Sequence, residues 1–207
     1  MVEYFINGGP FMWPILILLL AGFGIVGERF YSLLSSSMDT AKFFEDVEES
    51  LNNNGIDATL ELCDNTEGPL AQIFSAGLSR IDRGLEEAEK AISNAASLEM
   101  SFLEKNMIWL NAVITIAPML GFTGTVAGMV NAFDAIAAAN DISPAVVAGG
   151  ISQALLTTAF GLIVAMIIQI FQNFFVSMID KLILDMEENS VKFMDQLHLE
   201  YEKLAQS

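Results

Sequence analysis

Four polar side chains lie in the middle of a long apolar segment in the second half of the chain. The segment, Ile142–Ile179, has 38 residues and no charged side chain, and its polar residues include Ser152, Gln153, Thr157 and Thr158. Hydroxyl and amide groups in such a place can hydrogen-bond to neighbouring helices. Their oxygens can also bind a hard cation or orient water for proton transfer. The residue types therefore allow either helix packing or ion conduction.

The helical period places three of these polar residues, Gln153, Thr157 and Thr158, on one face. Gln153 and Thr157 fall in an i, i+4 row of small and polar residues with Gly161, and Thr158 lies toward the edge of that face. In one interpretation the hydroxyls bond to carbonyls one turn earlier and the amide bridges two helices. In the other, the face lines a water-accessible path and its oxygens hold a moving cation. The pattern alone favours the first interpretation, and both stay open.

A second charge-free segment, 106–133, contains the glycine-rich stretch "GFTGTVAG". It lacks the strand and helix context of a nucleotide-binding loop. In an apolar helix, the spacing of Gly124 and Gly128, with Gly121 and Thr125 near the same side, predicts close helix packing.

No signature of an enzyme or of a metal site is present in the sequence. There is no phosphate loop, nucleophile elbow or paired His/Cys spacing, and Cys63 and His198 are the only residues of their types. We therefore expect no enzymatic activity, no bound cofactor and no metal.

The composition is that of a membrane protein. The chain has 207 residues, of which 53% are hydrophobic, and a mean hydropathy of +0.50. Three charge-free runs are each long enough to cross a bilayer. We predict an all-α fold with three transmembrane helices and long cytoplasmic helical extensions. The predicted segments are a short periplasmic amphipathic segment at 1–10, transmembrane helix 1 at 11–27, a cytoplasmic helical region at 28–105, transmembrane helix 2 at 106–133, a periplasmic loop at 134–144, transmembrane helix 3 at 145–179 and a cytoplasmic C-terminal helix at 180–207.

The charges predict the orientation. All nine Lys and Arg residues lie in 28–105 or 180–207, and none lies in 1–10 or 134–144. Basic segments stay in the cytoplasm, so the N-terminus is expected in the periplasm and the C-terminus in the cytoplasm. The net charge of −17 argues against nucleic-acid binding.

Local signals divide the region 28–105 into helices. Asp39 is expected to cap a helix that ends at Gly55, and Pro69 to begin a helix that runs to Gly84. No Gly or Pro occurs between Leu85 and Pro118, which predicts one helix from the cytoplasm into span two. The third span, likewise, is expected to continue as a helix into the C-terminal tail.

The two motifs "APMLGFTGTVAGM" and "VAGGISQALLTTAFGLIVA" resemble the MotA/TolQ/ExbB proton-channel family, and the three-span layout is similar to its ExbB/TolQ branch. By this resemblance, the family threonines fall on Thr125 and Thr158, and Pro118 and Gly121 match the "AP-x-x-G" pattern. Gln153 departs from the family, which often has glutamate there. We assign two sets of residues: Thr125, Thr158, Thr157 and Gln153 to an ion path, and Pro118, Gly121, Gly124, Gly128 and Gly161 to helix packing.

The resemblance also implies partners and a location. It implies a homo-oligomer, a pentamer in this branch, in the phospholipid bilayer of the bacterial inner membrane. Within this ring, a dimer of an ExbD/TolR-like single-span protein would supply an aspartate, and a TonB/TolA-like protein would receive the motion. Neither 107–133 nor 142–179 holds an ionisable side chain, so an acid from a partner is required if ions are carried. Protons are expected, Na⁺ stays open, and a non-conducting membrane scaffold is the alternative.

Overall fold

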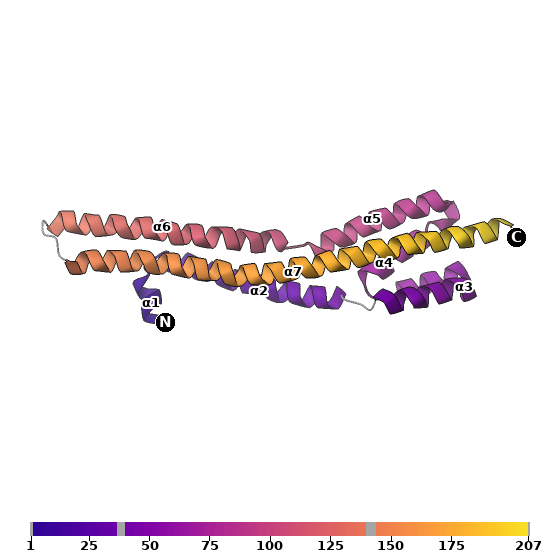
Figure 1. Ribbon diagram of the computed structural model, residues 1–207, viewed down its shortest axis with the longest axis horizontal. Coiled ribbons are helices and arrows are strands. Elements are labelled where there is room, and N and C mark those ends of the chain that lie inside the picture. Colours follow the sequence, from indigo (N-terminus) through magenta and orange to yellow (C-terminus); the bar gives the residue numbers. More distant parts are fainter. Residues whose placement is uncertain (1, 37–39, 140–143, 207) are drawn as a thin grey trace. The chain divides into compact units, whose positions relative to one another are not determined.

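The computed structural model describes residues 2–36, 40–139 and 144–206, and this part of the chain is helical apart from short connections (Figure 1). Its elements are α1 (Val2–Asn7), α2 (Met12–Ser36), α3 (Thr40–Asp64), α4 (Pro69–Leu78), the 3-10 helix η1 (Ile81–Arg83), α5 (Leu85–Leu103), α6 (Met107–Ala139) and α7 (Pro144–Gln206). The expected all-α fold is therefore confirmed.

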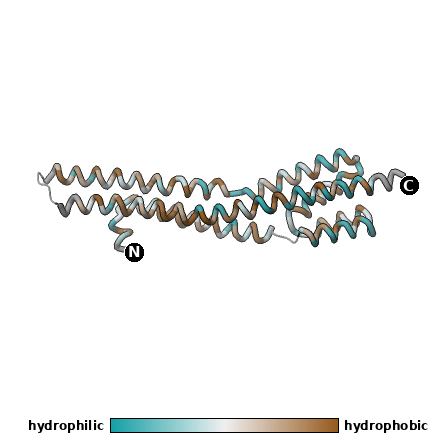
Figure 2. Tube along the Cα trace, in the orientation of Figure 1, coloured by the Kyte–Doolittle hydropathy of each residue, from teal (hydrophilic) through white to brown (hydrophobic). Residues whose placement is uncertain are grey.

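Three of the helical stretches are long and apolar enough to cross a membrane, as the charge-free runs predict. Figure 2 shows hydrophobic residues along α2, α6 and the first half of α7, and many hydrophilic residues along α3 and α5. The orientation of the two termini stays a prediction.

The chain forms two compact units. The membrane unit consists of Met1–Arg29 and Asn106–Phe174, and the polar unit consists of Phe30–Lys105 and Phe175–Ser207. Helices α2 and α7 contribute residues to both units.

In the membrane unit, α6 and α7 lie side by side and the first part of α2 packs against α7. Gly22 of α2 is buried, and a methyl group there would lie 2.9 Å from Cδ1 of Ile168. The rings of Phe23 and Phe171 meet edge to face with centroids 6.3 Å apart. These contacts connect the second half of the first span to the third span.

The connection between α6 and α7 is shorter than the predicted loop at 134–144. Helix α6 continues to Ala139, and α7 begins at Pro144. Alanine is the strongest helix former, so the segment "AIAAA" extends the helix beyond the end of the charge-free run. Proline is tolerated in the first turn of a helix because its missing N–H would have no partner there.

The prediction of one helix from Leu85 to Pro118 is wrong. Helix α5 ends at Leu103, and α6 begins at Met107. Between them lies Asn106, which has a φ of 64°. Among the described residues it is the only non-glycine residue with a positive φ. Asparagine tolerates the left-handed conformation better than most residues, so it can end a helix without a glycine or proline.

The polar unit has an aromatic core. Phe74 of α4 is fully buried, and its ring stacks on Phe193 of α7 with centroids 4.0 Å apart. Phe43 and Phe44 of α3 contact the same ring at 5.9 and 6.2 Å. This cluster joins α3 and α4, which are neighbours in the chain, to the distant C-terminal half of α7.

The helix boundaries predicted in the polar unit are partly correct. The backbone of α3 has a kink at Gly55, where φ is 82°, and α4 begins at Pro69. Helix α4 ends at Leu78 instead of Gly84, because η1 and a turn occupy the residues between them. Asp39, the predicted cap, lies outside the described residues. The continuous helix predicted after Gly161 is present in α7.

Candidate functional site

The membrane unit brings α6 and α7 together along a row of small residues. A methyl group added to Gly161 would lie 2.5 Å from the carbonyl oxygen of Ala117, and one added to Gly121 would lie 3.0 Å from Cα of Thr158. Further along, a methyl group on Gly128 would lie 3.1 Å from Cβ of Ala154. The helix backbones are therefore nearly in contact, and any side chain at these glycines would separate them.

Two other residues assigned to packing have different surroundings. Gly124 faces the methyl end of Thr157 and Cβ of Phe11, which would lie 3.3 Å from an added methyl group. Pro118 is inside α6 and half-buried, one residue after Ala117. Proline cannot donate to the carbonyl of Ile114, and such a break in the ladder is tolerated in a membrane helix when neighbours or side chains compensate.

The hydroxyls of Thr125 and Thr158 meet at this close contact and form a hydrogen bond across α6 and α7. The Thr158 hydroxyl also reaches the Gly121 carbonyl at 3.1 Å. The Thr125 hydroxyl reaches the Ala154 carbonyl at 3.1 Å and the Gly121 carbonyl at 3.3 Å. Both threonines are half-buried. We call Thr125 and Thr158 the hydroxyl pair.

The hydroxyl pair has fewer protons than acceptors. Two hydroxyls carry two protons, whereas the acceptors are two backbone carbonyls and the two hydroxyl oxygens themselves. Thr125 can donate to Ala154 while Thr158 donates to Thr125, or Thr158 can donate to Gly121 while Thr125 donates to Thr158. The pair can therefore reverse its direction and present a lone pair without any movement of the backbone.

Thr157 faces a different neighbour. It is fully buried, and its hydroxyl lies 2.8 Å from the Gly8 carbonyl and 2.9 Å from the Gln153 carbonyl. The side-chain amide of Gln153 fills the space next to Gly9, where a methyl group would overlap it. The structure thus divides the four predicted ion-path residues into two pairs. One is the hydroxyl pair, and the other is Thr157 and Gln153, which face the turn between α1 and α2 from α7. Their role in ion passage stays a prediction.

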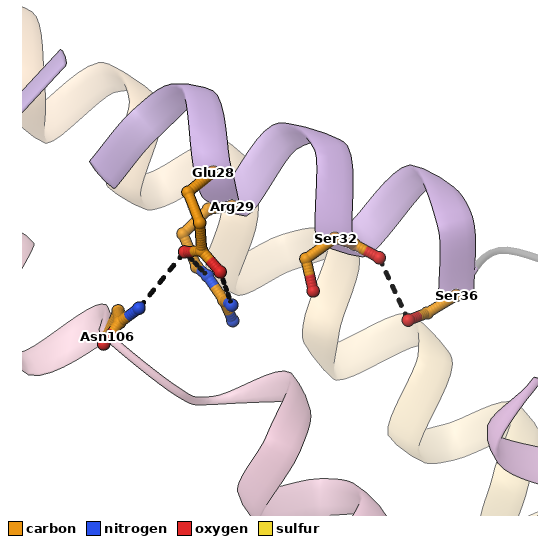
Figure 3. Close-up of polar contacts among 5 residues, drawn as sticks. All are labelled: Glu28, Arg29, Ser32, Ser36 and Asn106. Atoms are coloured by element: carbon orange, nitrogen blue, oxygen red, sulfur yellow. Dashed lines mark hydrogen bonds and ion pairs between the residues drawn. The ribbon is translucent and has the colours of Figure 1, made fainter. Parts of the chain in front are cut away.

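An ion pair lies near the end of the first span, and sequence reasoning had given it no role. Arg29 is 2% exposed, and its guanidinium donates to the carboxylate of Glu28 (Figure 3). The side-chain amide of Asn106 donates to the same carboxylate at 3.2 Å. Asn106 therefore both separates α5 from α6 and connects the start of α6 to the end of the first span. In the sequence, the only indication of this role was that Asn106 stands directly before the apolar run that begins at Met107.

The described residues contain no group of three or more His, Cys, Asp or Glu side chains able to hold a metal ion. Of the two carboxylates flanking the predicted outer loop, Asp134 is exposed on α6, and Asp141 lies outside the described residues.

Comparison with known proteins gives a family match over the region of this site. The MotA/TolQ/ExbB proton channel family matches residues 65–188, more than half of the 207 residues. A protein of Methanothermobacter thermautotrophicus that carries the name of an ExbB homolog is 32% identical over 180 residues, which cover 86% of this chain and 64% of that protein. The Tol-Pal system protein TolQ of Haemophilus influenzae is 28% identical over 169 residues, 73% of each chain. The biopolymer transport protein ExbB of Salmonella typhimurium is 42% identical over 67 residues, 32% of this chain and 28% of that protein.

Proposed function

Because this chain belongs to the MotA/TolQ/ExbB proton channel family, we propose that it is the channel-forming subunit of an ion-driven motor in the bacterial inner membrane. The observation that carries the proposal is the hydroxyl pair, Thr125 and Thr158, at the contact of two apolar helices. Its reversible hydrogen bonding provides oxygen ligands in segments that have no ionisable side chain.

The motor needs an acidic group from another protein. The sequence has no ionisable side chain in 107–133 or 142–179, and a proton relay requires a titratable group within the membrane. We propose that a dimer of an ExbD/TolR-like single-span protein supplies an aspartate inside a homo-oligomeric ring, with the pentamer as the expected size. A TonB/TolA-like protein would receive the resulting motion.

The hydroxyl pair would pass the ion to and from that aspartate. For a proton, the pair would reverse its hydrogen bonds and accept a proton on one side while releasing one on the other. For Na⁺, the same hydroxyl and carbonyl oxygens would serve as ligands, because hard cations prefer oxygen. Protons are the proposed ion, with Na⁺ as the alternative.

The basic residues support the orientation of the motor. Their confinement to 28–105 and 180–207 supports a cytoplasmic location for the polar unit and a periplasmic one for α1 and the α6–α7 connection, as the positive-inside rule predicts.

The test removes one hydroxyl of the pair. In Thr158→Val the side chain keeps nearly the same shape, and ion flux into proteoliposomes that contain the chain and its co-purified partner should fall about tenfold or more. Thr158→Ser keeps the hydroxyl and is the matched control. Flux is measured separately under a proton gradient and under a Na⁺ gradient, with assembly checked by size-exclusion chromatography. Unchanged flux in a fully assembled Thr158→Val complex would refute the ion path.

A membrane scaffold is the second candidate, and one observation favours it. Each of the hydroxyls of Thr125, Thr157 and Thr158 already contacts a backbone carbonyl, so all three can be explained by helix packing. A scaffold would show no flux in the wild-type complex, and Thr158→Val would then affect only stability.

A further inference from the structure

The turn between α1 and α2 is held against the third span by one hydrogen bond over a separation of 149 residues. The hydroxyl of Thr157 donates to the Gly8 carbonyl at 2.8 Å. That carbonyl receives no backbone donor within the described structure, because the N–H of Met12 donates to Gly9 instead, at 3.2 Å. An unpaired carbonyl is costly in an apolar environment, so Thr157 satisfies a group that the turn itself leaves open.

Two glycines of this turn lie against neighbouring side chains, and Gly9 also needs the backbone freedom of glycine. Gly9 has a φ of +77°, and a side chain there would overlap the amide of Gln153. A methyl group on Gly8 would lie 2.6 Å from Cγ of Met12, which is itself 1% exposed. The turn therefore fits closely against Gln153 on one side and against the start of α2 on the other.

The turn also reaches α6. Cβ of Phe11 lies 3.3 Å from the place where a side chain on Gly124 would begin, and Gly124 also faces Thr157. Through Gly8, Gly9 and Phe11, this turn lies against both helices that carry the hydroxyl pair. We call residues 7–11 the N-terminal turn.

We propose that the N-terminal turn is a positioning element for the hydroxyl pair, and that Thr157 and Gln153 are its docking residues and not ligands of the moving ion. This inference rests on the ion path proposed above. Thr157 and Thr158 are consecutive and point about 100° apart on the helix. Holding the Thr157 hydroxyl on Gly8 sets the rotation of α7 about its own axis, and that rotation aims Thr158 at Thr125.

The same contact gives a physical reason for an amide at position 153. The side chain of Gln153 lies against the backbone of Gly9, and residues 2–27 contain no Lys or Arg that could neutralise a carboxylate there. A glutamate would bring an uncompensated charge against this backbone, whereas a neutral amide brings none.

The test perturbs the turn from both sides. Thr157→Val removes the hydroxyl, and Gly9→Ala crowds Gln153 without touching Thr157. Hydrogen–deuterium exchange of the peptide covering residues 4–12 is measured in the full-length chain assembled with its partner, and ion flux is measured on the same preparations. In Thr157→Val exchange should rise about tenfold, as expected for the loss of one buried hydrogen bond. In Gly9→Ala it should rise because the φ of +77° and the contact with Gln153 strain the turn, and maximal flux should fall in both variants. The proton concentration at half-maximal flux should not change, because the ion's own ligands remain.

Matched controls accompany each variant. Thr157→Ser keeps the hydroxyl and should restore both exchange protection and flux. Gly24→Ala adds a methyl group where no atom lies within 4 Å, and it should leave both measurements unchanged. Thr158→Val should lower flux without raising exchange in the N-terminal peptide.

Two results would overturn the inference. Loss of flux in Thr157→Val with unchanged exchange would make Thr157 a direct ion ligand. Raised exchange in Thr157→Val and Gly9→Ala with normal flux would show that the N-terminal turn does not position the pair. Normal flux in Thr158→Val would instead refute the proposed ion path, and the exchange data would still report whether Thr157 holds the turn.

Discussion

Gly161 lies where the backbones of α7 and α6 approach closely, and its replacement by alanine should force the two helices apart. The added methyl carbon would lie 2.5 Å from the Ala117 carbonyl oxygen and 3.2 Å from Cα of Gly121. Ordinary contacts of such a carbon begin at 3.4 Å, so the gap must widen by 3.4 − 2.5 = 0.9 Å. Both obstructing atoms belong to the backbone and cannot rotate away.

The displacement is large enough to break the hydrogen bonds between the helices. Thr158 is one turn from Gly161, and its hydroxyl lies 3.1 Å from the Gly121 carbonyl. Widening the gap by the same amount takes that distance to about 4 Å, which is beyond hydrogen-bonding range. Loss of this bond and of close packing should cost about 1–3 kcal/mol. Ion flux should fall with it, because the hydroxyl pair no longer meets.

Gly149→Ala is the matched control, because it is the same substitution on the same helix, three turns earlier. No atom lies within 4 Å of the added methyl group, so stability should stay the same or rise slightly with the better helix propensity of alanine. The free energy of unfolding is measured for both variants by denaturation with SDS in mixed micelles, followed by circular dichroism. If Gly161→Ala and Gly149→Ala differ by less than about 0.5 kcal/mol, the close contact of α6 and α7 is refuted.

Three further predictions concern the polar unit. Phe74→Ala should lower its stability by about 3–5 kcal/mol in chemical denaturation, because the ring is fully buried and stacks on Phe193; Phe74→Leu should cost less. Burial and the charge of the adjacent Asp64 raise the pKa of the Cys63 thiol to about 12, so maleimide should label this thiol only when the protein unfolds. Labelling of the native chain at pH 7 would contradict this. Burial raises the pKa of the Glu99 carboxyl, so the folded state disfavours its charge and loses stability as the pH rises past the ordinary pKa of glutamate. Glu99→Gln should therefore raise the melting temperature at pH 7 but not at about pH 3.5. An equal effect at both pH values would be inconsistent with this.

Features that depend only on the residues of one segment could be predicted from the sequence. The three charge-free runs correspond to helices long enough to span a membrane, since length and hydropathy are properties of the segment itself. Gly55 and Pro69 mark a kink and a helix start because their backbone preferences act locally. The break at Asn106 was missed, because asparagine only permits positive φ, and its contact with Glu28 comes from a segment 78 residues away.

In the candidate site, too, contacts between distant segments could not be predicted from the sequence. The sequence by itself determined which residues have hydroxyl or amide groups in apolar segments, and the helical period placed Gln153, Thr157 and Thr158 on one face of the third span. Only the tertiary structure decided which neighbour each of them meets: Thr158 meets Thr125 on α6, whereas Thr157 meets the Gly8 carbonyl. The period of a helix gives the direction of a side chain relative to its own axis, but the rotation of that axis is set by contacts between distant parts of the chain. In this protein those contacts are made by Gly121 and Gly128 of α6 and by the N-terminal turn.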